Sequence, residues 1–170
     1  MSGTSFSSVS VLPDANASWT IAAVGDFDGD SDLDILWQNI STGQVGLWTM
    51  NNAAFVSSSL MAIAPPNWSI VGAADFDGDN DLDLLWHNAS TGQVGIWQMN
   101  GVSLQSVSLL PTVPGWEPVG ITDLEGNGSL DIVLRNYQSG QNGVWRMNGT
   151  SFSSAVELPT VPLDWDVYFS

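Results

Sequence analysis

The sequence repeats itself with a step of 48 or 49 residues. The motif Asp-Phe-Asp-Gly-Asp at residues 26–30 returns at residues 75–79, and a weaker copy, Asp-Leu-Glu-Gly-Asn, follows at residues 123–127. Two series of tryptophans keep the same step: Trp19, Trp68, Trp116 and Trp165, and Trp48, Trp97 and Trp145. A fixed period of this length is typical of units that bury their apolar faces by stacking on their neighbours. The chain of 170 residues therefore holds about three and a half copies of one unit.

Each unit has the pattern of four short strands. In the second unit, runs rich in valine, isoleucine, leucine and tryptophan span residues 68–73, 82–88, 93–99 and 102–110, and turn-forming residues separate them. No stretch of ten or more residues has the 3.6-residue hydrophobic period of a helix. We therefore expect an all-β fold, a β-propeller-type array of four-stranded antiparallel blades in about 3.5 repeats.

The register of the repeat sets the expected boundaries. We expect blades at residues 14–65, 66–111 and 112–159, with a lone outer strand at residues 1–13 and a lone inner strand at residues 160–170, each belonging to an incomplete blade. Closed propellers use about four to eight blades, and open sheet edges invite pairing. The expected partner is therefore either another copy of the chain, joined head to tail, or the remainder of a longer propeller chain.

Carboxylates alternate along the first turn of each unit. In the first two units they occupy positions 1, 3, 5, 7 and 9 of a nine-residue loop: Asp26, Asp28, Asp30, Asp32 and Asp34, and Asp75, Asp77, Asp79, Asp81 and Asp83. Such crowding is unfavourable unless a cation neutralises it, and a hard divalent cation takes six to eight oxygen ligands. We expect Asp32 and Asp81, at position 7, to bind through the backbone carbonyl while their side chains face water. Gly29 and Gly78 permit the sharp bend.

The third loop carries fewer charges, so we expect weaker binding there. Its candidate ligands are the side chains of Asp123, Glu125, Asn127 and Asp131 and the backbone carbonyl of Ser129. The number of oxygen ligands favours Ca²⁺ over Mg²⁺, whereas zinc and copper prefer imidazole or thiolate. The sequence thus predicts two strong calcium sites and one weaker site. The alternative is a solvated acidic turn without an ion.

Composition excludes several functions. The formal net charge of −16 disfavours nucleic acid as a partner. No apolar run approaches the roughly 18 residues of a membrane helix, so we expect no membrane insertion. Without cysteine, calcium would take the stabilising part that disulfides play elsewhere. The acidic residues outside the loops form no evident acid/base pair, so we expect no enzyme activity.

Trp37 and Trp86 end the second strand of their units, and His87 follows the second of them. Aromatic faces beside polar groups suit sugar stacking, so Trp37, Trp86 and His87 are candidate glycan-binding residues. Packing between blades is the other interpretation of these tryptophans. The second tryptophan series is expected in the core: Trp48, Trp97 and Trp145.

Two of the Asn-X-Ser/Thr sequences stand in equivalent turns. They begin at Asn39 and Asn88, which are the candidate N-glycosylation sites. Turn-rich repeats generate such tripeptides freely, so their presence alone does not establish modification.

Residues 73–86, Ala-Ala-Asp-Phe-Asp-Gly-Asp-Asn-Asp-Leu-Asp-Leu-Leu-Trp, and residues 91–97, Thr-Gly-Gln-Val-Gly-Ile-Trp, together resemble the FG-GAP/VCBS repeats. Those repeats form calcium-binding blades in integrin α-subunit propellers, many secreted bacterial proteins and some seven-bladed fungal lectins. Val71-Gly72 stands here in place of the Phe-Gly that gives the family its name.

The resemblance implies a calcium-stabilised module at the cell surface or outside the cell, used for non-catalytic recognition of a glycan or cell-surface ligand, or for adhesion. The alternative is a purely structural repeat that assembles into a ring, fibre or surface layer without a small ligand. Fold alone does not choose between them.

Overall fold

The computed structural model describes residues 17–165, so the expected lone outer strand at residues 1–13 lies outside the described part. Of the expected lone inner strand at residues 160–170, residues 160–165 form no strand and the rest lie outside. The described residues form twelve strands and no helix. Within that span, a helix able to cross a membrane is accordingly absent.

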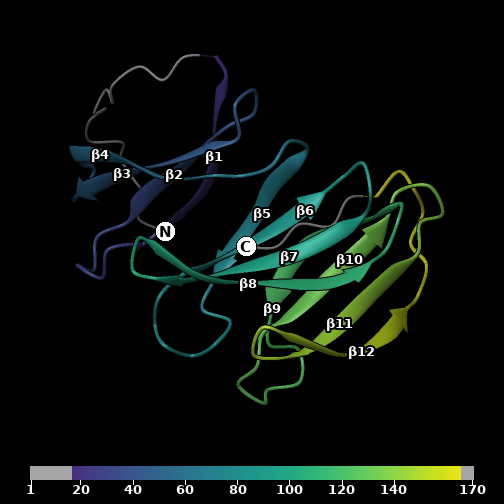
Figure 1. Cartoon of the computed structure of the whole chain (residues 1–170). Helices are drawn as coiled ribbons and strands as arrows, with labels where there is room; N and C mark the ends of the chain where they lie inside the picture. The colour runs from purple at the N-terminus through teal and green to yellow at the C-terminus, as the bar shows by residue number, and fades with distance from the viewer. Residues whose placement is uncertain (1–16, 166–170) are drawn as a thin grey trace, which may run out of the picture.

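The strands form three four-stranded antiparallel sheets, called blades 1, 2 and 3 (Figure 1). Blade 1 contains β1 (Trp19–Gly25), β2 (Asp34–Asn39), β3 (Gln44–Asn51) and β4 (Ala54–Ile63). Blade 2 contains β5 (Trp68–Ala74), β6 (Asp83–Asn88), β7 (Gln93–Asn100) and β8 (Ser103–Thr112). Blade 3 contains β9 (Trp116–Thr122), β10 (Asp131–Asn136), β11 (Asn142–Asn148) and β12 (Ser151–Leu158). Strands that follow one another in the chain pair within each blade, so the predicted propeller-type array of four-stranded blades is confirmed.

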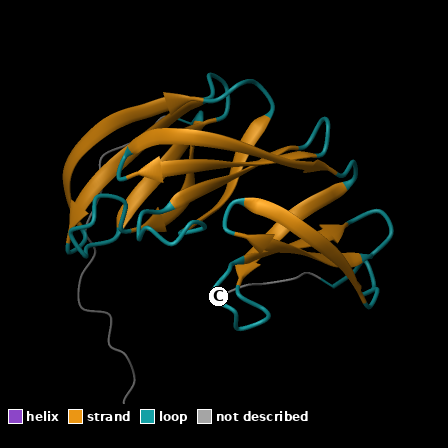
Figure 2. Ribbon diagram, turned by 60° about the horizontal axis from the view of Figure 1, so that its bottom comes forward, coloured by secondary structure: helices purple, strands orange, loops and turns teal. Residues whose placement is uncertain are grey.

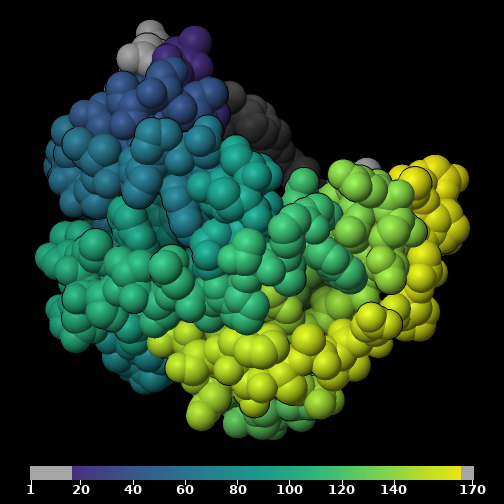
Figure 3. All heavy atoms as spheres, turned by 45° about the vertical axis from the view of Figure 1, so that its right-hand side comes forward, coloured from purple at the N-terminus to yellow at the C-terminus, as the bar shows by residue number. Residues whose placement is uncertain are grey.

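The blades pack face to face in chain order (Figure 3). The first strands β1, β5 and β9 neighbour one another, and the loops lie at the strand ends (Figure 2). Successive side chains of a strand point to opposite faces. Leu84 and Trp86 of β6 therefore join the core between blades 1 and 2, while Leu85 between them joins the core between blades 2 and 3. All six residues of β6 are buried, because this middle strand has another blade packed on each of its faces.

The turn between the second and third strands of each blade also holds the segment that leads to the next blade. Gly92, with φ of +74°, donates its amide to the Asn88 carbonyl at 2.8 Å, and its own carbonyl accepts the Val113 amide at 2.9 Å. Gly43 and Gly140 make the equivalent bonds in the other blades. This turn therefore fixes where the next blade begins.

One polar side chain near the end of the second strand of each blade forms a hydrogen bond with the backbone of the following unit. Gln38 donates to the Trp68 carbonyl at 2.7 Å and accepts the Ile70 amide at 3.0 Å. His87 hydrogen-bonds to the backbone of Trp116. Arg135 donates to the Trp165 carbonyl at 2.9 Å. Three chemically different residues thus reach the same place, the backbone of the tryptophan one unit further on.

Replacing Gly92 with alanine should destabilise the protein more than the same change at Gly101. Both glycines have positive φ, where an L-residue costs about 1–2 kcal/mol. A Cβ at Gly92 would also lie 2.6 Å from the Pro114 backbone, whereas a Cβ at Gly101 would meet nothing within 4 Å. We expect Gly92→Ala to lower the free energy of unfolding by about 1–3 kcal/mol more than Gly101→Ala, as overpacked sites do. Urea unfolding measures the difference, and equal losses would contradict the role given to this turn.

Candidate metal centres

The loop between the first and second strands of each blade is folded around the aspartate at position 1. In blade 2, Asp75 Oδ1 accepts the amides of Gly78 and Asp79 at 2.7 and 3.1 Å, and Oδ2 accepts that of Asn80 at 2.9 Å. Asp26 and Asp123 make the equivalent bonds in blades 1 and 3. Three backbone amides thus donate to one carboxylate, and these bonds keep the loop curled.

The aspartate at position 9 ties the loop to the third strand of its blade. Asp83 is fully buried; its Oδ2 accepts the Phe76 amide at 3.0 Å and its Oδ1 accepts the Met99 amide at 2.9 Å. Asp34 and Asp131 repeat this pair of bonds. Burial raises the pKa of Asp83 to about 6, against the effect of the two amides, and the charges of Asp77 and Asp79 raise it further. A bound cation would favour the ionised form.

Three carboxylates converge in each of the first two loops, at positions 1, 3 and 9. Their oxygens lie within 4.8 Å of one another in two triads: Asp26, Asp28 and Asp34, and Asp75, Asp77 and Asp83. Oxygens that share one calcium ion at about 2.3–2.6 Å must lie at such separations. The donors are all hard oxygens, without imidazole or thiolate. Both triads therefore fit Ca²⁺.

The other predicted ligands of these loops lie outside the triads. At position 5, Asp30 and Asp79 accept the amides of Asp32 and Asp81 at 2.8 and 2.9 Å. At position 7, the expectation that the Asp81 side chain faces water is corrected, because its Oδ2 accepts the Gly101 amide at 2.8 Å. The β7–β8 turn lies beside the loop and offers this amide. Asp32, its counterpart in blade 1, is half-buried.

The third loop keeps the fold of the others but not the triad. Asp123 and Asp131 retain their bonds to backbone amides, and Ser129 donates its amide to Asn127 at 2.8 Å. The position-3 side chain, Glu125, instead pairs with Arg146, with 2.6 Å between Oε1 and Nε. Among the described residues, a cluster of carboxylates suited to a metal forms only in the first two loops. The weaker third site therefore stays a prediction, and Glu125 is drawn away from it.

The structure separates the candidate glycan-binding residues. Trp86 is 1% exposed, and Trp37 is half-buried. His87 is buried on the opposite face of β6 from Trp86, because neighbouring residues of a strand point to opposite sides, and burial lowers its pKa. Trp86 and His87 therefore do not share one surface, which corrects that expectation.

The candidate glycosylation sites are buried in the turns that they cap. Asn39 Oδ1 accepts the amides of Ser41 and Thr42, and Asn88 Oδ1 accepts those of Ser90 and Thr91. Their side chains are engaged in holding the turn rather than presented to solvent. The sequence pattern is thus explained by turn formation.

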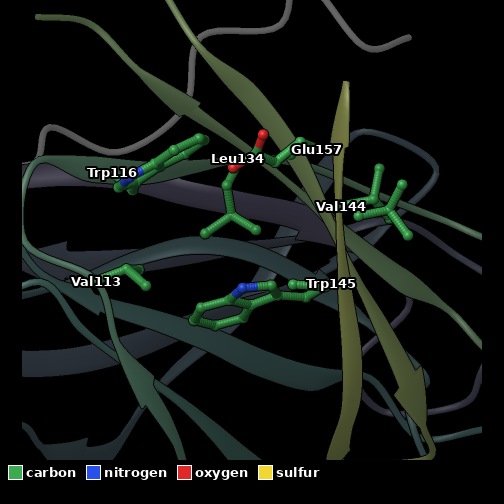
Figure 4. Close-up of a pocket in the computed structure, with 9 residues that line it drawn as sticks. Val113, Trp116, Leu134, Val144, Trp145 and Glu157 are labelled. Atoms are coloured by element: carbon green, nitrogen blue, oxygen red, sulfur yellow. The ribbon is translucent and has the colours of Figure 1, made fainter. Parts of the chain in front are cut away.

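Two clefts recur at equivalent places in blades 2 and 3. The first has a volume of about 350 Å³ and is lined by Pro65, Trp68, Trp86, Trp97, Val107 and Leu109, among others. The second, of about 330 Å³, is lined by Val113, Trp116, Leu134, Trp145, Val156 and Glu157, among others (Figure 4).

Of the tryptophans expected in the core, Trp145 is buried while Trp48 and Trp97 are only half-buried. Each cleft therefore contains one tryptophan from each of the two series of the repeat: Trp68 and Trp97 in the first, Trp116 and Trp145 in the second.

The FG-GAP-like repeat family matches residues 26–86 and 75–134. Each match begins at the position-1 aspartate of a loop and extends to the second strand of the next blade. Together they cover more than half of the chain, which therefore belongs to this family. No curated protein matches the sequence.

Replacing Asp77 with alanine should remove a calcium ligand without disturbing the loop. Its carboxylate is exposed and accepts a hydrogen bond from the Gln98 side chain, at 3.2 Å. A ligand present at one hundred times its Kd stabilises the fold that binds it by about 2.7 kcal/mol. Such a loss lowers the melting temperature by roughly 5–10 °C in a protein of this size.

We therefore expect Asp77→Ala to melt earlier than the unmodified chain in saturating calcium, and at nearly the same temperature in excess chelator. Asp83→Ala is the matched comparison and should lower both values, because it also frees the Phe76 and Met99 amides. Scanning calorimetry measures the melting temperature of all three proteins in both buffers. A melting temperature of the unmodified chain that does not respond to chelator would exclude calcium from these loops.

Proposed function

We propose that this chain is a calcium-stabilised, non-catalytic recognition module that works outside the cell or at its surface and binds glycans in the clefts of blades 2 and 3. The observation that carries the proposal is the recurrence of one tryptophan-lined cleft in two consecutive blades, at Trp68 with Trp97 and at Trp116 with Trp145. Both clefts are lined at equivalent positions of the repeat, so each of these blades would offer the same kind of binding surface.

The chemistry of the clefts suits a sugar. Indole rings offer flat apolar faces on which the C–H face of a pyranose can stack. In the described part of the chain, the Trp86 Nε1–H is a buried donor without a hydrogen-bond partner, and Trp86 lines the first cleft. Glu157 supplies an acceptor at the second cleft. Mostly apolar walls with a few polar groups are typical of small-molecule sites.

The metal loops support the location. Calcium sites of extracellular modules have dissociation constants of about 10⁻⁴–10⁻³ M, which are close to the calcium concentration outside cells. The chain has no cysteine, so two ions bound in the triads would stabilise a secreted fold that cannot form disulfides.

Binding to a glycan microarray in calcium buffer tests this function. We expect specific signals that fall at least tenfold when Trp97 or Trp116 is changed to alanine. Trp165→Ala is the matched control, since Trp165 is exposed and lines neither cleft. Thermal melts establish that each variant is folded. A silent array with folded, calcium-loaded protein, or equal signals from the variants, would exclude glycan binding in the clefts.

One observation favours the second candidate function, self-assembly without a small ligand. The face of blade 1 that corresponds to the buried leading face of blade 2 has no blade packed on it in the described part of the chain. Ile21 is 57% exposed, whereas Ile70, one unit later, is 8% exposed. Burying such a face against another blade would repeat the contact already made twice within the chain.

We expect Ile21→Asp to abolish any assembly larger than one chain, because a buried carboxylate at this face would be strongly unfavourable. Ile40→Asp is the control, since Ile40 is similarly exposed but lies in the turn after β2. Mass photometry in calcium buffer measures particle size. Only monomers of the unmodified chain would argue against assembly and leave recognition as the function.

A further inference from the structure

The residue opposite position 3 of the acidic loop differs between the blades. It lies on the third strand, immediately before the methionine whose amide is held by the position-9 aspartate. That bond fixes the strand beside the loop in each blade. The three residues at this place are Thr49 on β3, Gln98 on β7 and Arg146 on β11.

These three side chains make different contacts. The Thr49 hydroxyl bonds to the Ser57 hydroxyl at 2.6 Å, on the neighbouring strand β4. Gln98 Nε2 donates to Oδ2 of Asp77, the position-3 ligand, at 3.2 Å. Arg146 Nε lies 2.6 Å from Oε1 of the position-3 residue Glu125. The residue on the third strand thus bonds elsewhere in blade 1, makes a hydrogen bond to position 3 in blade 2, and forms an ion pair with position 3 in blade 3.

The placement of Arg146 is unusual for this composition. The chain has only two basic residues other than histidine, against 18 acidic ones, and the other, Arg135, is buried at the end of β10. Arg146, the other basic residue, therefore lies at the loop that lacks a carboxylate triad. Its fixed positive charge compensates Glu125, and a divalent cation arriving there would be repelled by the guanidinium and would have to compete for the carboxylate.

We propose that Arg146 replaces the calcium ion of the third loop, and that the residue at positions 49, 98 and 146 decides whether a loop binds metal. The proposal rests on the calcium sites assigned to the first two loops. In blade 3 the position-3 carboxylate, Glu125, then stays paired when calcium is scarce, while the triads of blades 1 and 2 depend on the ion. The chain binds two calcium ions rather than three.

Calcium stoichiometry measured by isothermal titration calorimetry, with atomic spectroscopy after equilibrium dialysis, tests the proposal. We expect two ions per unmodified chain. The double variant Glu125→Asp/Arg146→Thr gives the third loop the position-3 and third-strand residues of blade 1, and should bind three. Gln98→Arg should bind one, because the new guanidinium would pair with Asp77.

Thr112→Arg is the matched control for the added charge. Thr112 is exposed on β8 of the same blade and pairs with Gln93, at the end of the blade opposite the loop, so this variant should still bind two ions. Thermal melts show that each variant is folded.

The outcomes separate this inference from the proposed function. An unmodified chain that binds three ions, a double variant that still binds two, or a Gln98→Arg variant that keeps both would overturn the role of Arg146 and its equivalents, and would leave calcium in the first two loops. An unmodified chain that binds none would overturn the calcium sites themselves, and this inference with them.

Discussion

The fold depends on one buried carboxylate per blade. The aspartate at position 9 accepts a backbone amide from the acidic loop with one oxygen and a backbone amide from the third strand with the other, and Asp34, Asp83 and Asp131 all do so. Loop and strand cannot separate without leaving a buried charge unpaired, which is far costlier than losing an exposed bond. The interaction persists in blade 3, where positions 3, 5 and 7 of the loop carry Glu125, Asn127 and Ser129 in place of aspartate. Its structural role is therefore separable from metal binding.

Much of the architecture follows from the sequence, because a repeat with turn residues at fixed places defines its strands and its loops. The alternation of aspartates likewise locates the loops that hold the two triads, although only positions 1, 3 and 9 converge there. What the sequence does not show are contacts between segments whose side chains only the fold brings together. Glu125 and Arg146 are 21 residues apart, and nothing in either motif indicates their pairing. The bond of Asp81 to the Gly101 amide is of the same kind.

Sequence also misjudges the surfaces that a strand presents. Trp86 and His87 are neighbours in the chain yet belong to different interfaces, and Trp97, which packs against the core as expected, also lines a cleft. Asn39 and Asn88 match a modification motif because their side chains cap a turn. In each case, a local pattern has a local structural cause, and its accessibility is set by the adjacent blade.

The hydrogen bonds made by Gln38, His87 and Arg135 have one more consequence. Gln38 and His87 each join a blade to the backbone of the next blade, and Arg135 bonds to the backbone that follows blade 3; backbone groups are the same whatever side chains a unit carries. A unit can therefore exchange the side chains at its first strand without losing this bond to the unit before it, whereas the apolar cores between blades still have to match.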